Sequence, residues 1–154
     1  MTLMDIPAAL HRGEDELPFV ELEPGVELQL LQVDIPNGLW VIRNRFAPGT
    51  KVQKHKHTGQ VFAFTQSGSW KYAEYPEVNT AGSYLFEPAG SIHTLIVPET
   101  NTEVTDVWFA IYGANLNLRD DDSVELVIDA QLVLDFYRML CAAQGIENPP
   151  VIGA

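Results

Sequence analysis

Short segments in which apolar and polar residues alternate recur along most of this chain, and they constrain its fold more than any other feature. In an early segment, Val26, Leu28 and Leu30 alternate with charged and amide residues, which places the apolar side chains on one face of a strand. The dipeptide Asn37-Gly38 then predicts a two-residue type I′ hairpin into a strand over residues 39–46. Further short runs, each bounded by turn residues, are found at residues 52–57, 61–65, 70–75, 83–87, 93–97 and 104–112. This spacing predicts an all-β sandwich or barrel.

Helical spacing is found only near the end of the chain. After a polar turn at residues 120–123, apolar side chains recur three or four positions apart between Leu132 and Ala143. Asp129 is typical of a helix N-cap, and Gly145 is typical of a C-terminal stop. The sequence therefore predicts a C-terminal α-helix that follows the β-strands.

The length of 154 residues, with no internal repeat or linker, fits one domain. We expect that domain to cover residues 1–154, with a barrel core over residues 26–128 and the helix over residues 129–144. The residues from Asn148 onward are expected to form a loosely held tail.

Composition excludes several classes of protein. The formal net charge of -12 would repel the phosphates of a nucleic acid, and no apolar run is long enough to cross a membrane. The one cysteine, Cys141, cannot form an intrachain disulfide. The first residues show neither the basic nor the apolar region of a secretory signal, so we expect a cytoplasmic protein.

Three histidines are the candidate metal ligands. His55 and His57 are one residue apart, so a strand would point both imidazoles to the same side, and His93 could supply a third ligand. Neutral imidazoles bind Fe, Zn, Cu and Ni, and three of them leave coordination positions open for water, dioxygen or a substrate. An open site of this kind indicates chemistry more than a structural role.

The histidines stand within two motifs that contain glycine. The motifs are Gly49-x5-His55-x-His57, continuing to Gly68, and Gly82-x5-Pro88-x-Gly90-x2-His93. This arrangement resembles the two sequence motifs of the cupin superfamily, in which tight turns bring the histidines together inside a small barrel. Within that superfamily, residues 55–60 together with Gly68-Ser69-Trp70 and Phe86-Glu87-Pro88 most resemble the dihydroxyacetophenone dioxygenase group, and also the ChrR-like cupin domains. The resemblance implies a double-stranded β-helix, or jelly roll, with a metal ion in the mouth of the barrel.

The chain departs from the general cupin pattern at two positions. Val61 stands where the first motif usually has glutamate, and Val97 stands where the second often has asparagine. The site would then resemble the three-histidine acetylacetone-cleaving and cysteine dioxygenase branches, and the ion would keep its full double charge. That resemblance implies Fe(II), with Zn, Ni or Mn as other candidates. It also implies a reaction with dioxygen that cleaves a carbon-carbon bond next to a carbonyl in a small diketone or α-hydroxy aryl ketone.

Basic side chains near the histidines are expected to attract such a substrate as its anion. They are Arg43, Arg45, Lys51, Lys54, Lys56 and Lys71. Arg45 is our candidate for direct substrate binding, and a surface salt bridge is the alternative for it.

Three further polar residues are candidates for the site. The acetylacetone-cleaving cupins resemble this chain in having a glutamate at the position of Glu87, which implies that Glu87 holds a histidine or polarises a bound water, with an outward, solvated side chain as the alternative. Gln60 could reach a metal-bound water or the substrate, or bond its own turn. Glu74 could approach the ion or the substrate if Trp70 and Tyr72 face the opposite way.

Two other functions stay open. One is a zinc-binding sensor of the ChrR type, in which the same histidines serve regulation. The other is a metal isomerase or a non-catalytic small-molecule binder, because a fold does not determine a function. We also expect a homodimer, formed through a sheet edge between Leu17 and Val33.

Overall fold

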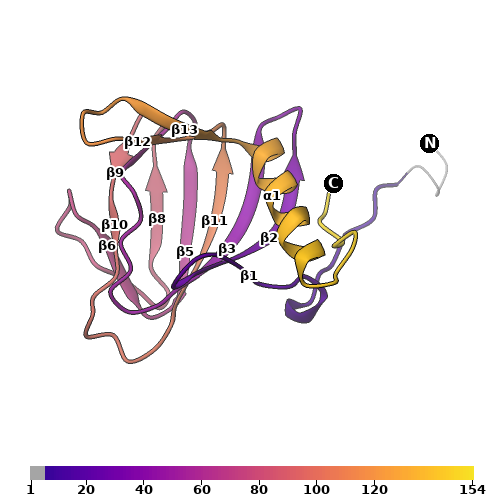
Figure 1. Cartoon of the computed structure of the whole chain (residues 1–154), viewed down its shortest axis with the longest axis horizontal. Helices are drawn as coiled ribbons and strands as arrows, with labels where there is room; N and C mark the ends of the chain where they lie inside the picture. Colours follow the sequence, from indigo (N-terminus) through magenta and orange to yellow (C-terminus); the bar gives the residue numbers. More distant parts are fainter. Residues whose placement is uncertain (1–5) are drawn as a thin grey trace.

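The computed structural model describes residues 6–154, which form mostly β-strands. A short 3-10 turn at Glu14–Glu16 precedes the strands, and α1 (Ala130–Ala143) follows them. The strands are β1 (Val20–Glu23), β2 (Val26–Asp34), β3 (Leu39–Phe46), β4 (His55–His57), β5 (Val61–Ser67), β6 (Ser69–Tyr72), β7 (Asn79–Thr80), β8 (Tyr84–Glu87), β9 (Ile92–His93), β10 (Leu95–Ile96), β11 (Thr105–Tyr112), β12 (Asn115–Leu118) and β13 (Val124–Ile128). The predicted all-β fold with a C-terminal helix is confirmed (Figure 1).

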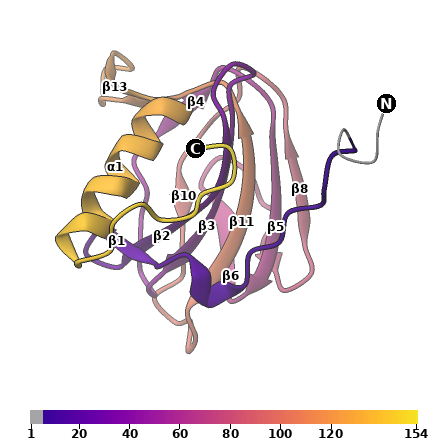
Figure 2. The same cartoon turned by 90° about the vertical axis from the view of Figure 1, so that its right-hand side faces the viewer.

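The strands form a large sheet and two smaller ones, and every pair of named strands is antiparallel. The large sheet has the order β1-β2-β3-β11-β5-β8. The smaller sheets have the orders β13-β12-β4-β9 and β10-β6-β7. Figure 2 shows β3, β11, β5 and β8 on one side of the molecule, with β4, β13 and α1 on the other. This two-layered arrangement is the jelly roll that the motifs predict.

The hydrophobic core lies between these layers because the large sheet buries every second side chain. In the register of β3 with β11, Trp40 pairs with Ile111 and Ile42 pairs with Phe109, and all four side chains are buried. Burying a side chain of this size contributes about 1.5–3 kcal/mol. The intervening residues of these strands face away from the core, so polar side chains can occupy them.

The turn between β2 and β3 differs from the predicted hairpin. The connection has four residues, Ile35 to Gly38, and the amide of Gly38 donates to the carbonyl of Ile35 at 3.1 Å. Gly38 has a φ of 71°, but Asn37 does not share a positive φ, whereas a type I′ turn needs two such residues. The Asn37 side chain instead donates to Asp34 at 2.8 Å, which stabilises the longer turn.

The C-terminal helix begins and ends where the sequence predicts. Asp129 accepts a hydrogen bond from the amide of Leu132 at 2.9 Å, and Gly145 follows the last turn with a φ of 77°. The buried side of α1 is formed by Ala130, Val133, Leu134, Tyr137 and Cys141. Among residues 6–154, no helix is long and apolar enough to cross a membrane.

The C-terminal residues are held more firmly than expected. The amide of Ile152 donates to the carbonyl of Leu31 at 3.0 Å, and the carbonyl of Ile152 accepts from the amide of Val33 at 2.8 Å. Val151 is buried. The tail therefore packs against β2, and the prediction that it is loosely held is wrong.

Candidate metal centre and cavity

Four buried polar side chains from three strands meet inside the protein. His55 and His57 are both buried on β4, and Lys56 between them is exposed, as the alternation of a strand requires. His93 on β9 pairs in register with His55, and Glu87 is the last residue of β8. The three histidines predicted to act together are therefore neighbours in space.

The turn after β8 places His93 beside β4. Gly90 has a φ of 87°, a conformation that favours glycine, and its amide donates to the carbonyl of His57 at 2.7 Å. The amide of His57 in turn donates to the carbonyl of Ser91 at 3.0 Å. The positive φ explains why the second motif has a glycine three residues before His93, and the two hydrogen bonds hold this turn against β4.

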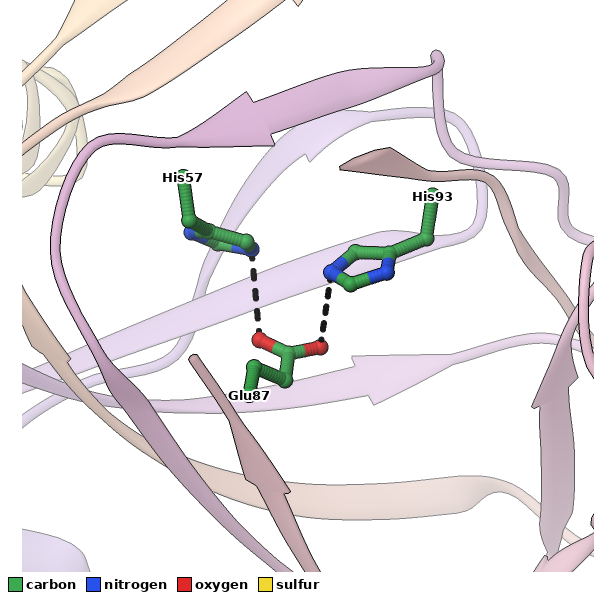
Figure 3. A group of neighbouring side chains, drawn as sticks. All are labelled: His57, Glu87 and His93. Carbon is green, nitrogen blue, oxygen red and sulfur yellow. Dashed lines mark ion pairs between the residues drawn. The ribbon is translucent and has the colours of Figure 1, made fainter. Parts of the chain in front are cut away.

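The carboxylate of Glu87 lies between two of the imidazoles. Its Oε2 is 3.3 Å from Nε2 of His57, and its Oε1 is 3.1 Å from Nε2 of His93 (Figure 3). No more than 4% of any of these three side chains is exposed. One possible ligand atom from each of the three lies within 4.8 Å of the others.

These donor atoms fit a metal ion. Two imidazoles and one carboxylate are a ligand set that Fe(II) and Zn(II) both accept. Nε2 of His93 and Oε2 of Glu87 are buried, and within residues 6–154 neither has a hydrogen-bond partner of suitable geometry. Leaving a buried polar atom unsatisfied costs about 1–3 kcal/mol, and a cation held by these atoms would remove that cost.

His55 lies beside this cluster. Its ring centroid is 4.8 Å from that of His57 and 5.8 Å from that of His93. Nδ1 of His55 is 2.9 Å from the carbonyl oxygen of Gln53, which favours the tautomer with a proton on Nδ1 and a free lone pair on Nε2. His55 is thus prepared to act as a ligand, and its place in the metal site stays a prediction.

Tyr72 completes the cluster, and no role was predicted for it from the sequence. Its ring stacks on His93 with centroids 4.0 Å apart and an interplanar angle of 12°, and its hydroxyl donates to Oε1 of Glu87. Burial and the nearby charge of Glu87 raise the pKa of Tyr72 well above its ordinary value, so the hydroxyl keeps its proton. The alternation of Trp70 with Tyr72 on β6 was the available signal, since both side chains are buried.

The protonation states of the cluster suit a metal ion. Burial lowers the pKa of His57 to about 4, and it also lowers the pKa of His55. Burial alone raises the pKa of Glu87, but the close contact with His93 and the charge of His57 outweigh it, so the net effect lowers this pKa. Neutral imidazoles and an ionised carboxylate are the forms that bind metals.

A cavity of about 530 Å³ extends from the cluster toward α1. His55, His57 and Tyr72 line it at the buried end. Residues of β2, β3, β11, β13 and α1 form much of its remaining wall. The candidate metal centre therefore opens into a space that is large enough for an organic ligand.

Gln60 and Glu74 do not line this cavity. Gln60 is exposed, and its backbone carbonyl accepts a hydrogen bond from the amide of Tyr112 at 3.0 Å. Glu74 is also exposed, and its Oε2 accepts from the amide of Thr94 at 3.0 Å. Glu74 was expected to approach the ion only if Trp70 and Tyr72 faced the opposite way. Both of these side chains are buried instead. The structure therefore does not bring the side chain of Gln60 or of Glu74 to the cavity.

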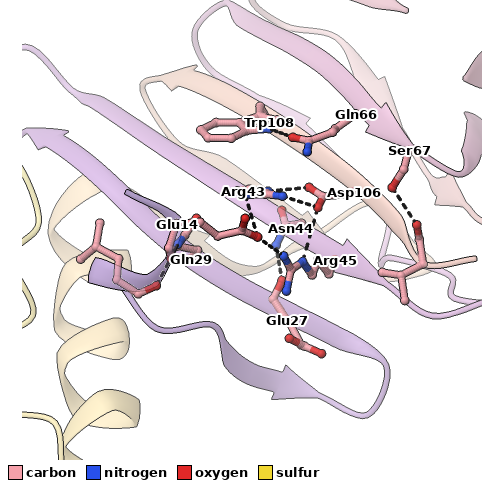
Figure 4. Close-up of polar contacts among 12 residues, drawn as sticks. Glu14, Glu27, Gln29, Arg43, Asn44, Arg45, Gln66, Ser67, Asp106 and Trp108 are labelled. Atoms are coloured by element: carbon pink, nitrogen blue, oxygen red, sulfur yellow. Dashed lines mark hydrogen bonds and ion pairs between the residues drawn. The ribbon is translucent and has the colours of Figure 1, made fainter. Parts of the chain in front are cut away.

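Arg45 lies on the outer face of the large sheet. Its guanidinium group contacts Glu14 and is 3.4 Å from Asp106 (Figure 4). It also lies 3.8 Å from the centroid of the Phe19 ring. Arg43 binds the same Asp106 through two hydrogen bonds of 2.7 Å. This position corrects the prediction that Arg45 meets the substrate, and it supports the salt-bridge alternative.

Most of the other basic side chains near the histidines also lie outside the cavity lining. Lys54 pairs with Asp122, and Lys56 is exposed. Lys51 is the only one of the six predicted basic residues among those that line the cavity. The expectation that the basic residues together attract an anion into the site is therefore not supported.

Comparison with known families matches residues 9–113 to the ChrR cupin-like domain. A search of curated proteins finds no match. Among solved structures, a protein of unknown function with a cupin-like fold from Ralstonia eutropha is 34% identical, with a TM-score of 0.84 over 96% of this chain and 97% of that chain. The similarity thus extends over nearly the whole of both chains.

Two structures with described functions share the fold at lower identity. An acetylacetone dioxygenase from Acinetobacter johnsonii is 16% identical, with a TM-score of 0.76 over 88% of this chain and 93% of that chain. The anti-sigma ChrR of Rhodobacter sphaeroides, solved in complex with SigE, is also 16% identical, with a TM-score of 0.54 over 65% of this chain and 51% of that chain. At these identities the likeness concerns the fold alone.

Proposed function

The chain belongs to the family of ChrR cupin-like domains, and from this membership and the geometry of the site we propose that it is an Fe(II)-dependent dioxygenase. The proposed reaction cleaves a carbon-carbon bond next to a carbonyl in a diketone or an α-hydroxy aryl ketone. The observation that carries the proposal is the cluster of His57, Glu87 and His93 beside a large, mostly apolar cavity. Two histidines and one carboxylate with open positions are typical of non-haem Fe(II) oxygenases.

In this proposal, His57, His93 and Glu87 hold the ion, and His55 supplies a further imidazole. Bound iron would supply the redox chemistry with dioxygen. Each turnover would consume one dioxygen molecule and leave one of its oxygen atoms in each of the two products. Zn, Ni or Mn could occupy the same ligands, since these donor types accept several ions.

The protein's own side chains would position the reactants. The Tyr72 hydroxyl donates to Oε1 of Glu87 and its ring stacks on His93, so it fixes the orientation of both groups. The apolar wall around Trp40 and Phe109 would exclude water and align the substrate. Substrate deprotonation would be favoured near the cation, without help from the basic residues on the outer face.

The test combines metal analysis with dioxygen uptake. Protein reconstituted with Fe(II) is assayed with pentane-2,4-dione, 1-phenylbutane-1,3-dione and 2-hydroxyacetophenone. We expect the wild type to consume dioxygen with at least one of these compounds. The His93→Ala variant should bind no iron and should consume no dioxygen. His11→Ala is the matched control, because 89% of the His11 side chain is exposed, and it should behave as the wild type. Iron bound normally by His93→Ala, or no uptake by iron-loaded wild type, would count against the proposal.

A zinc-binding module is the second candidate. It is favoured by the family match and by the shared fold of the anti-sigma ChrR. Stoichiometric zinc in natively purified protein, without dioxygen uptake after iron loading, would support this candidate or a non-redox metal enzyme instead. The same His93→Ala variant should then lose zinc.

A further inference from the structure

The two ends of the cavity differ in chemistry. At the inner end, His57 and Tyr72 are 3% and 4% exposed, and both contact Glu87. At the outer end, three large apolar residues are exposed, although they line the same cavity: Leu22 by 46%, Leu126 by 43% and Phe136 by 43%. These three residues come from β1, β13 and α1.

The wall between the two ends is mostly apolar. Buried side chains such as Leu28, Trp40 and Ile42 form it. Two of the polar residues in the lining are Asn44, which donates its amide to the carbonyl of Glu27 at 3.1 Å, and Gln53, which donates to the carbonyl of Leu118 at 2.9 Å. Their amide donors are therefore already engaged by the protein backbone, and an apolar group fits this part of the cavity best.

The few charges in the lining do not select an ion. Among the residues that line the cavity, Lys51 and Glu23 are the two with opposite full charges at the surface, and both are exposed. Arginine side chains near the histidines are engaged by Glu14 and Asp106 on the far face of the sheet. A tail without net charge is therefore favoured over a second anionic group.

A single exposed apolar side chain on a protein surface needs no explanation. Here three such side chains from separate elements line one opening, and an apolar patch at the mouth of a cavity marks a ligand site. The cavity volume of about 530 Å³ also lies in the range of pockets that enclose drug-sized ligands. A five-carbon diketone held by the cluster would occupy only the inner end.

We infer that the ligand of this cavity is an uncharged amphipathic ketone with an extended alkyl or aryl tail. Its oxygen-bearing head lies at the inner end, beside His57 and Tyr72. Its tail follows the apolar wall and contacts Leu22, Leu126 and Phe136 at the mouth. The position of the head rests on the proposed function, whereas the tail site rests on the cavity alone.

The experiment measures binding to zinc-loaded protein, which needs no turnover. Isothermal titration is carried out with pentane-2,4-dione, heptane-2,4-dione and nonane-2,4-dione. We expect affinity to rise about threefold to fourfold for each methylene that becomes buried. Phe136→Ala should lower the affinity for nonane-2,4-dione by about three- to tenfold. The affinity for pentane-2,4-dione should not change, since only the longer chain reaches the mouth of the cavity.

Met139→Ala is the matched control. Met139 is three residues further along α1 and 56% exposed, but it does not line the cavity, so its removal should change neither affinity. Equal affinities for the three diketones, or equal effects of Phe136→Ala and Met139→Ala, would overturn the inference. Circular dichroism confirms that each variant is folded.

A second titration, with protein stripped of metal by chelation, separates this inference from the proposed function. If the cluster binds no metal, the rise of affinity with chain length should persist in both preparations, and only the proposed function would fail. If the protein binds iron and consumes dioxygen but shows no dependence on chain length, the tail site alone would fail.

Discussion

At the scale of single residues, the position of Glu87 follows from strand register. Glu87 on β8 pairs with Val61 on β5, and paired residues in a sheet project to the same face about 4.5–5.5 Å apart. Val61 occupies the position where related motifs have a glutamate. The neighbouring strand therefore supplies a carboxylate to the region that Val61 leaves apolar. Glu87 is close enough to His57 and His93 to act as a ligand itself.

Replacement of Glu87 by glutamine tests this role. Glu87→Gln keeps the size of the side chain and removes its charge, so we expect metal affinity to fall by about 10- to 100-fold while the protein stays folded. Metal competition with a chromophoric chelator measures the affinity. Glu74→Gln is the control, because Glu74 is exposed and outside the cavity lining. An unchanged affinity in Glu87→Gln would remove Glu87 from the ligand set.

Acid sensitivity of the metal-free protein is a second consequence at this scale. The pKa of His57 falls from an ordinary value of 6.5 to about 4 in the folded protein, so between these pH values the unfolded chain binds a proton that the native state excludes. Stability therefore falls on acidification through this window, by about 2 kcal/mol between pH 7 and pH 5. The lowered pKa of Glu87 acts in the same direction, since its contribution is also lost as pH falls.

Urea unfolding in the presence of a chelator checks this expectation. The midpoint of wild type should be clearly lower at pH 5 than at pH 7, and His57→Gln should show a smaller difference. An equal midpoint at the two pH values would show that the burial of His57 does not disfavour its protonated form.

The residue types of the site could be predicted from the sequence, but their partners could not. Period-two alternation and glycine turns are local signals, and they identify His55, His57 and His93. The contacts of Glu87 and Tyr72 depend on which strands pair and in which register, and neither is a local property. Arg45 was misplaced for the same reason, because proximity along the chain does not show which face of β3 a side chain occupies.

At the scale of elements, α1 was predicted well because its signals are local. Its cap, its spacing and its terminal glycine all lie within one segment of sequence. The contact of Ile152 with β2 was missed, because a parallel bridge to a distant strand leaves no periodic pattern in so short a segment. The β2–β3 turn was misjudged because the Asn37 side chain binds Asp34 and favours a longer connection.

Loss of the α1 cap should destabilise the protein modestly. Asp129→Ala removes the acceptor for the amide of Leu132, and such changes cost about 1 kcal/mol. For a domain of this size we expect the melting temperature to fall by about 2–4 °C. Asp135→Ala, an exposed acid in the middle of the same helix, is the control and should change it less. Equal shifts for the two variants would indicate that the cap contributes nothing specific.

At the scale of the whole molecule, the expected homodimer stays a prediction, and the large sheet offers two edge strands for it, β1 and β8. Leu17, Leu28 and Val33 are buried within the monomer, so a contact at the β1 edge would use the strand backbone and the exposed Leu22. Phe64 and Phe86 lie on the outer face of β5 and of the edge strand β8, and about half of each residue is exposed. The outward residues of these two strands carry no charge, so two copies of this acidic chain would repel each other least there.

Light scattering measures the state of assembly. Wild type should have about twice the chain mass of 17.1 kDa, and Phe86→Asp should be monomeric, because a charge at the centre of an apolar contact opposes association. Val124→Asp changes another exposed apolar residue on β13, away from this face, and should remain dimeric. A wild type that is monomeric at all concentrations would exclude the homodimer.

The candidate ligands also join the two layers of the fold. Glu87 lies on β8 of the large sheet, whereas His57 and His93 lie on β4 and β9 of the four-stranded sheet. A bound ion would therefore add a direct link between the two sheets to the contacts that Glu87 makes with His57 and His93. Since the core residues contact one another without the ion, we expect the metal-free protein to stay folded and the metal to add stability.

The size of that stabilisation follows from the affinity. An ion that binds only the native state adds about 2.7 kcal/mol when its concentration is 100 times the dissociation constant. For a domain of this size, the melting temperature should then rise by about 5–10 °C. Calorimetry of chelated and metal-loaded samples measures the rise, which should be nearly absent in His93→Ala and complete in His11→Ala. An equal rise in His93→Ala would mean that the ion binds elsewhere and that the link between the two sheets does not exist.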